Sequence, residues 1–274
     1  MRARSLTGIV LGTVVALVVG AASTQAAELR LLTWKGYAPN EVVEQFEKET
    51  GIKVNITYSS NEEMISKLRA TGGAGFDLAQ PSQDRITGAQ QEYKIYRPFD
   101  LSKVKTALFI PSMLEATKKN TTLNGRVYGL PHIWGTDGLI VNKKAAAAAS
   151  DYLDLCDPKY TGRVSYRAKR PVLIAFAFAM GKDPFALYAD KGKYKALMEQ
   201  IGEKLIACKK HVKDYWTNGD ALLAFMRTGE VTLAMGWDNG GWKLTQENPD
   251  LVFVAPKSGA LGWIDTFALP AKAR

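Results

Sequence analysis

The residues best suited to chemistry are aromatic rings that lie close in sequence to carboxylates. Trp237 is followed directly by Asp238, and Trp263 precedes Asp265 by two positions. A cation over an indole face gains about 0.5–2 kcal/mol, and a carboxylate adds a charge-assisted hydrogen bond of roughly twice the neutral strength. These groups predict a site for an alkylammonium ion. The full candidate set is Trp34, Tyr37, Ser82, Asp84, Trp237, Asp238, Trp263 and Asp265.

A cluster of cations forms a second chemical feature. Arg167, Lys169 and Arg170 stand immediately before Pro171, which is expected to open a helix. The amino end of a helix carries about half a positive charge, and such a place attracts phosphate, sulfate or carboxylate. Arg167 and Arg170 are therefore candidate ligands for an acidic group, with Asp265 holding an amine at the other end. The alternative is that these cations are solvated surface side chains.

Few residues suggest catalysis. His132 and His211 are the only histidines, and both are better explained as structural or exposed side chains. The sequence contains no Gly-x-Ser-x-Gly motif, no Gly-rich phosphate loop and no metal-ligand spacing. We therefore expect no enzyme activity, no metal and no cofactor. One alternative of another class stays open, a secreted hydrolase that uses two carboxylates meeting in a cleft.

The first 26 residues have the pattern of a secretory signal. Arg2 and Arg4 precede the apolar run Ile9–Ala22, and Thr24 and Ala26 supply small residues for cleavage. We expect cleavage after Ala26 and export to the periplasm. A membrane anchor is the alternative, but the run is shorter than the roughly 20 residues that span a bilayer.

The charge balance is basic. The formal net charge is +9, and loss of two arginines with the signal would leave +7. A basic surface suits nucleic acid, an anionic membrane or an acidic ligand. Because the lysines are scattered and no basic stripe is interleaved with aromatics, we expect no nucleic-acid partner.

Cys156 and Cys208 are the only cysteines. An even pair in an exported protein indicates a disulfide, and two buried thiols are the alternative. Their spacing matches no metal or redox motif.

Strands and helices alternate along the chain. The patterns predict strands at 29–33, 52–56, 76–79, 163–166, 231–235 and 251–254, and helices at 41–49, from 61, at 171–181 and at 220–227. Asn40 and Asn61 are expected to cap the first two helices. This order predicts parallel strands with crossover helices. Ligands bind beyond the carboxyl ends of such strands, which is where the aromatic and acidic residues stand.

Several segments resemble the polyamine-binding (spermidine/putrescine) periplasmic proteins. They are Leu32–Tyr37, Phe46–Val54, Phe76–Leu78 with Pro81 and Ser82, Leu130–Gly135, Gly229–Val231 and Gly262–Pro270. The resemblance covers essentially the whole chain after the signal. It implies a type II periplasmic-binding-protein fold of two α/β lobes, each a mixed sheet flanked by helices, joined by a two-crossing hinge. It also implies capture of a small charged solute and its delivery to an ABC permease of the inner membrane.

The resemblance carries ligand contacts onto Trp34, Tyr37, Ser82, Trp237, Trp263 and Asp265. Gly36 and Asp84 depart from it, because the polyamine binders have an acid at the first position and an aromatic at the second. The loop 167–170 departs most, since it holds cations where the polyamine binders hold acids. A polyamine-like solute is the first interpretation. An anionic or zwitterionic solute, such as an amino-acid derivative, an opine or an aminophosphonate, is the alternative.

We expect residues 27–132 with 265–274 to form lobe I and residues 133–264 to form lobe II. The hinge crossings fall near 131–135 and 262–265. Members of the family continue past the position of Arg274, so the C-terminal part of lobe I is expected to be missing. The protein is expected to act as a monomer.

Overall fold

The structure is a computed structural model that describes residues 27–274. The expected signal, residues 1–26, lies outside the described residues, so its cleavage stays a prediction. Within residues 27–274, no helix combines the length and the apolar character that crossing a membrane requires.

The first part of the chain forms a small sheet in the order β2-β1-β3, and both neighbours of β1 run parallel to it. Its elements are β1 (Glu28–Thr33), α1 (Asn40–Thr50), β2 (Lys53–Tyr58), α2 (Asn61–Thr71), β3 (Leu78–Ala79), α3 (Ile86–Tyr93), β4 (Tyr96–Arg97), α4 (Pro111–Thr121), β5 (Thr122–Leu123) and β6 (Arg126–Val127). The predicted strand–helix alternation is therefore confirmed in this part of the chain.

The predicted N-caps of the first two helices are wrong by one residue. The Pro39 carbonyl accepts hydrogen bonds from the second turn of α1, so Asn40 is already helical. At α2 the cap is Ser60, whose backbone N–H donates to the Glu63 carboxylate at 2.8 Å. This frees the Asn61 side chain, which donates to Ser82 Oγ at 2.8 Å and accepts from the Ser82 N–H at 2.9 Å. The helix start thus positions a candidate site residue.

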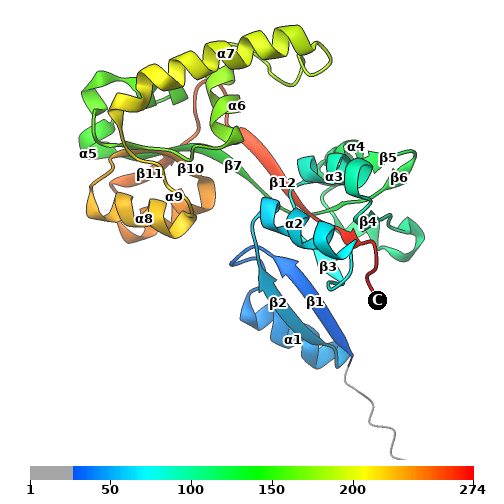
Figure 1. The fold of residues 1–274 in the computed structure, drawn as a ribbon. Coiled ribbons are helices and arrows are strands. Elements are labelled where there is room, and N and C mark those ends of the chain that lie inside the picture. The colour runs from blue at the N-terminus through cyan, green and yellow to red at the C-terminus, as the bar shows by residue number, and fades with distance from the viewer. Residues whose placement is uncertain (1–26) are drawn as a thin grey trace, which may run out of the picture.

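The second part forms a six-stranded sheet in the order β11-β7-β10-β8-β9, with β12 also paired to β7. Its elements are β7 (Leu130–Asn142), α5 (Lys143–Ala146), β8 (Val164–Ser165), α6 (Arg170–Ala179), α7 (Lys191–Cys208), β9 (Val212–Asp214), α8 (Gly219–Thr228), β10 (Leu233–Trp237), α9 (Asp238–Glu247), β11 (Leu251–Val254), β12 (Leu261–Phe267) and β13 (Leu269–Pro270), the last of which pairs with β4. Figure 1 shows α6 and α7 on one side of the large sheet and α8 and α9 on the other.

Alternation along the central strands builds a core on each face of the large sheet. Leu139 and Val141 of β7 pack in one apolar cluster with α6 and α7. Ile140, between them, packs in another cluster with α8 and α9. Successive strand residues point to opposite faces, so burial on both faces explains the nearly continuous apolar run. The predicted fold class, mixed sheets flanked by helices, is confirmed.

Two long antiparallel strands connect the two groups of elements (Figure 1). Residues 130–137 of β7 pair with residues 261–267 of β12. At one end, the Thr266 N–H donates to the Pro81 carbonyl at 2.8 Å, beside the small sheet. At the other end, β7 pairs with β10 and β11. The lobe boundaries expected from the sequence fall inside these two strands.

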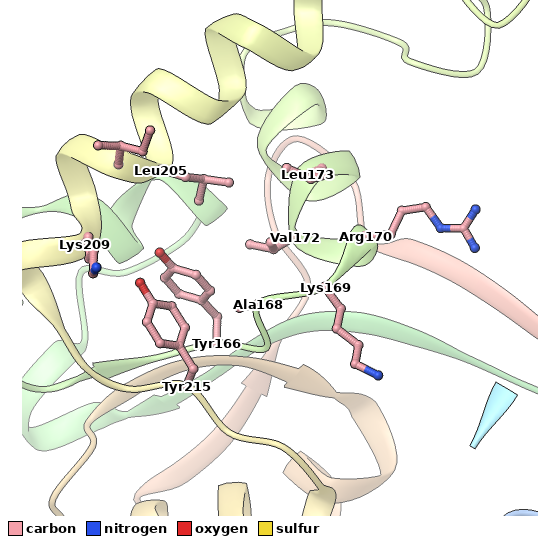
Figure 2. Close-up of a pocket in the computed structure, with 10 residues that line it drawn as sticks. Tyr166, Ala168, Lys169, Arg170, Val172, Leu173, Leu205, Lys209 and Tyr215 are labelled. Carbon is pink, nitrogen blue, oxygen red and sulfur yellow. The ribbon is translucent and has the colours of Figure 1, made fainter. Parts of the chain in front are cut away.

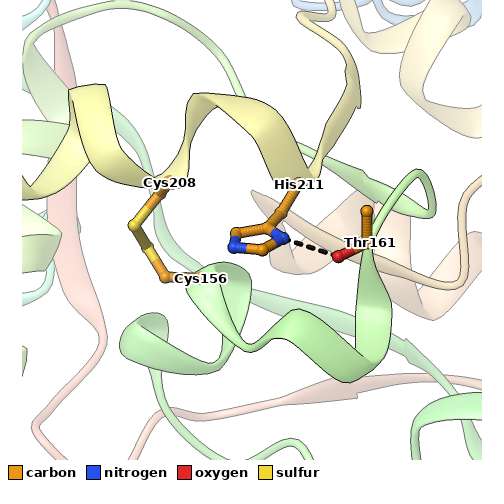
Figure 3. The surroundings of a disulfide bond; sticks show 4 residues. All are labelled: Cys156, Thr161, Cys208 and His211. Carbon is orange, nitrogen blue, oxygen red and sulfur yellow. Dashed lines mark hydrogen bonds between the residues drawn. A yellow bond between two sulfur atoms is a disulfide. The ribbon is translucent and has the colours of Figure 1, made fainter.

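A disulfide ties α7 to the preceding segment. Cys208 at the end of α7 is bonded to Cys156, 52 residues earlier (Figure 3). Nearby, His211 Nδ1 and Thr161 Oγ1 are hydrogen-bonded at 2.6 Å. Both contacts hold the C-terminal end of α7 against the segment that precedes this helix, next to the apolar cluster that α6 and α7 share.

We predict that the double substitution Cys156→Ser, Cys208→Ser lowers the free energy of unfolding by about 2–4 kcal/mol, because a bridge restricts the unfolded chain. Urea unfolding of the oxidised protein and the variant measures this difference. A reducing agent should destabilise the wild type and leave the variant unchanged. Equal unfolding free energies with and without the bridge would contradict the prediction.

Candidate ligand-binding site

Several predicted ligand residues lie on one face of the β10-β7-β12 ladder. Directly opposed residues of neighbouring strands share a face, and alternate residues along a strand do too. The side chains of Trp237, Asp137, Trp263 and Asp265 therefore point to the same side, the side covered further along by α6 and α7. The register pairs Trp237 with Asp137, Asp137 with Leu261, Gly135 with Trp263, and Ile133 with Asp265.

Asp265 is a buried carboxylate held by two hydroxyl groups. Its residue surface is only 4% exposed. Tyr37 donates its hydroxyl hydrogen to Asp265 Oδ2 at 2.7 Å, and Ser82 forms a strand bridge with Asp265. Burial raises the pKa of Asp265, while hydrogen bonds from Ser82 and Tyr37 act in the opposite direction. A desolvated carboxylate held by neutral donors is suited to an incoming cation.

Aromatic rings surround this carboxylate. The Trp34 and Tyr37 ring centroids are 6.4 Å apart, and those of Tyr37 and His132 are 5.5 Å apart. Phe267 continues the cluster at 4.5 Å from His132. Burial lowers the pKa of His132 and so favours its neutral form. The sequence predicted His132 only as a structural or exposed residue, whereas its ring packs edge to face against that of Tyr37.

The side chains of Trp263 and Asp238 both lie close to the backbone of Gly135. A Cβ atom on Gly135 would overlap the Trp263 indole and come within 3.0 Å of Asp238 Oδ1, so this position requires glycine. The Asp238 carboxylate accepts hydrogen bonds from the Thr136 N–H at 2.8 Å and the Thr136 hydroxyl at 2.9 Å. Asp238 therefore fastens β7 to the start of α9 rather than facing outward as a ligand.

Arg167 lies beside two tryptophans and a buried acid. Its guanidinium carbon is 5.4 Å from the centroid of Trp216 and 5.6 Å from that of Trp237. Asp137, 5% exposed, lines the same small cavity. Burial raises the pKa of Asp137 to about 7, which the charge of Arg167 partly offsets. Sequence patterns gave no sign of Asp137 or Trp216, because their proximity to Arg167 arises from contacts between segments that are distant in sequence.

Three ion pairs join the two groups of elements across the site. Arg170 and Asp84, both predicted as ligand residues, pair with each other at 2.8 Å. Lys169 pairs with Glu62 at 3.4 Å, and Lys35 with Asp220 at 2.9 Å. Side chains in these pairs are between 42% and 79% exposed, so water and salt screen them. Two of the three cations in the loop 167–170 are thus already matched by acids.

A cavity with a volume of about 390 Å³ lies elsewhere and opens between α6 and α7. Figure 2 shows Lys169 and Arg170 at its edge with their charged ends pointing away from Tyr166 and Tyr215. None of the predicted ligand aromatics lines it. Residues 27–274 also contain no group of three His, Cys, Asp or Glu side chains arranged for a metal ion.

The chain thus combines two groups of α/β elements with aromatic and charged side chains on one face of the ladder. Residues 41–274 match the family described as bacterial extracellular solute-binding protein. The chain belongs to this family, which confirms the predicted resemblance. Its relatives are transport components rather than enzymes, in agreement with the expectation from the sequence.

Two curated relatives come from Escherichia coli. The putrescine-binding periplasmic protein PotF is 28% identical over 290 residues, covering 98% of this chain and 75% of the relative. A spermidine/putrescine-binding periplasmic protein is 29% identical over 274 residues, covering 94% and 73% respectively. Among solved structures, the PotD lipoprotein of Treponema pallidum has a TM-score of 0.78 at 24% identity, with 90% of this chain and 76% of that chain covered.

The same fold occurs with other ligands. AgtB of A. tumefaciens, solved with agropinic acid, has a TM-score of 0.68 at 17% identity, covering 90% of this chain and 73% of that chain. A GABA receptor has a TM-score of 0.70 at 18% identity with the same two coverages. At these identities the likeness concerns the fold alone.

We predict that Asp84→Lys loosens the contact between the two groups, because it places a second cation against Arg170. Small-angle scattering at low salt should show a larger radius of gyration. An exposed pair contributes roughly 0.2–1 kcal/mol, so the effect should fade at high salt. Asp84→Lys, Arg170→Asp should restore the wild-type radius. Glu115→Lys, which breaks a pair inside α4, is the control; an equal effect there would refute the assignment.

We predict that Asp137 makes the protein less stable as pH rises. Its folded pKa of about 7 lies above the value near 3.8 of an unperturbed aspartate. Between these values the folded state holds a proton that the unfolded state has released, so stability falls with rising pH. Unfolding free energies at pH 5 and pH 7.5 should differ less in Asp137→Asn than in the wild type. If the difference between the two pH values is the same in the variant, the folded pKa of Asp137 is not near 7 and the prediction is wrong.

Proposed function

We propose that this chain is the periplasmic substrate-binding component of an ABC importer and that it captures a small solute with a protonated amine. The amine would bind Asp265, with Tyr37 and Ser82 orienting the carboxylate and the rings of Trp34 and Trp263 flanking it. One observation carries the proposal: the groups that act on the buried Asp265 carboxylate are two hydroxyls and another carboxylate, Asp84. The protein itself therefore supplies no countercharge there, and a ligand cation would.

The solute would lie between two lobes. We propose lobe I as residues 27–132 with 265–274 and lobe II as residues 133–264, with β7 and β12 as the two hinge crossings. Tyr37 and Ser82 belong to the first lobe, and Trp237 and Arg167 belong to the second. A ligand that touches both sets would favour closure, since all of its contacts form only when the lobes are together. The ion pairs between the groups support this arrangement.

Two solute classes have separate support. A polyamine-like solute is supported by the curated relatives, whose names specify putrescine and spermidine. A zwitterionic or anionic solute is supported by Arg167, which stands among the candidate ligand residues, and by fold neighbours named for agropinic acid and GABA. A secreted hydrolase, the candidate of another class, has no supporting observation.

The loaded receptor would deliver its solute to a permease in the inner membrane. We propose that the protein does this as a monomer in the periplasm and has no nucleic-acid partner. The names of the relatives, which are periplasmic binding proteins, support the location.

We predict that Asp265→Asn lowers the affinity for amine solutes at least tenfold, because it removes the carboxylate that would pair with the ammonium. Thermal shift against putrescine, spermidine and amino-acid derivatives tests this: a ligand at one hundred times its dissociation constant adds about 2.7 kcal/mol of stability. Asp250→Asn, which removes a carboxylate paired with Lys144 far from the site, should bind like the wild type. Equal binding by Asp265→Asn and wild type would refute the amine site.

A further inference from the structure

Arg167 occupies an aromatic corner of the candidate site. The rings of Trp216 and Trp237 meet edge to face, with centroids 5.0 Å apart and planes at 75°. The Arg167 guanidinium lies within about 6 Å of both centroids, the range in which a cation is attracted to an indole face. The corner that would hold a ligand cation therefore already holds a cation of the protein.

Above its pKa of about 7, Asp137 supplies a countercharge for this arginine. It is buried, shares a cavity with Arg167 and the two indoles, and interacts electrostatically with the guanidinium. The cavity measures about 10 Å³, which is space for about one water molecule.

Arg167 also has an unused donor. Its Nε atom is buried and has no hydrogen-bond partner within residues 27–274. A buried N–H without a partner favours an incoming acceptor, and an ionised acceptor most of all. Lys169 and Arg170 are less available, because each is paired with an acid of the first group. Arg167 is thus the cation of this loop that is best placed to bind an anion.

The two proposed subsites, at Asp265 and at Arg167 with Asp137, lie at different levels along β7. Asp265 stands opposite Ile133, and Asp137 is four positions further along β7. At roughly 3.4 Å per residue the levels of the two subsites differ by about 14 Å. An extended solute of several methylene groups would span this separation.

We infer that Arg167 takes the place of a second solute cation, so that the solute has one amine, held by Asp265, and a carboxylate, held by Arg167. Asp137 is a positioning residue that keeps the guanidinium on the two indoles. This inference rests on the proposed function and narrows its solute class to extended ω-amino carboxylates. A diamine of equal length would meet like charge at its second end.

Matched pairs of compounds test the inference. Isothermal titration calorimetry compares 4-aminobutanoate to 8-aminooctanoate with the α,ω-diamines of equal chain length, using the full chain. At least one ω-amino acid should bind tenfold or more tightly than its diamine. Arg167→Ala should weaken that amino acid at least tenfold, and Arg167→Asp should reverse the preference. Arg167→Lys keeps the charge and should therefore retain the preference for the amino acid. Circular dichroism melting verifies that each variant is folded.

The variant Asp137→Asn distinguishes a positioning role of Asp137 from a general structural role. At pH 8, where Asp137 is ionised, this variant should lower the ratio of amino-acid to diamine affinity at least threefold, because the guanidinium loses the charge that holds it on the two indoles. If Asp137 has only a structural role, the variant should lower both affinities by the same factor. That result would overturn the positioning role of Asp137. A wild-type preference for diamines that still depends on Asp265 overturns the inference and leaves the proposed function in place. Binding of neither series overturns the proposed function itself.

Discussion

The antiparallel pairing of β7 with β12 is the constraint on which the site depends. The ladder places Trp263 opposite Gly135 and Asp265 opposite Ile133, while β10 places Trp237 opposite Asp137. A slip of one residue would turn every side chain of one strand to the other face. The overlap that any side chain at position 135 would have with Trp263 protects this register. Three segments distant in sequence thereby present one continuous row of aromatic and charged groups.

The carboxylates in this row are largely shielded from water. Asp265 and Asp137 are both buried, yet they have different neighbours: hydroxyls surround the first, and an arginine accompanies the second. A buried carboxylate without a cation gains from a ligand cation, whereas one that already has a cation does not. Two acids on one face can therefore serve opposite purposes, one binding and one positioning. The ion pairs at the edge of this row join the two groups of elements.

Local patterns in the sequence predicted part of the fold. Alternation and helix periodicity located the strands β1, β2, β3, β8, β10 and β11 and the helices α1, α2, α6 and α8. The long strands β7 and β12 were not predicted, and the candidate residues Trp263 and Asp265 lie inside β12. The capping residues were displaced by one position, because Ser60 and Glu63 together compete successfully with Asn61. Asp137 and Trp216 were missed because their significance arises from register and packing between segments far apart in sequence. The partners of Lys169 and Arg170 were missed for the same reason.

The connection by two hydrogen-bonded strands also determines how the halves of the molecule can move. A paired ribbon resists stretching and lateral sliding, since either would break several backbone hydrogen bonds at once. It yields more easily to torsion about its long axis, because strands twist at low cost. Relative displacement of the halves should therefore be a screw-like rotation centred on the ribbon. The row of aromatic and charged groups lies on that ribbon, so the axis of rotation passes beside this row.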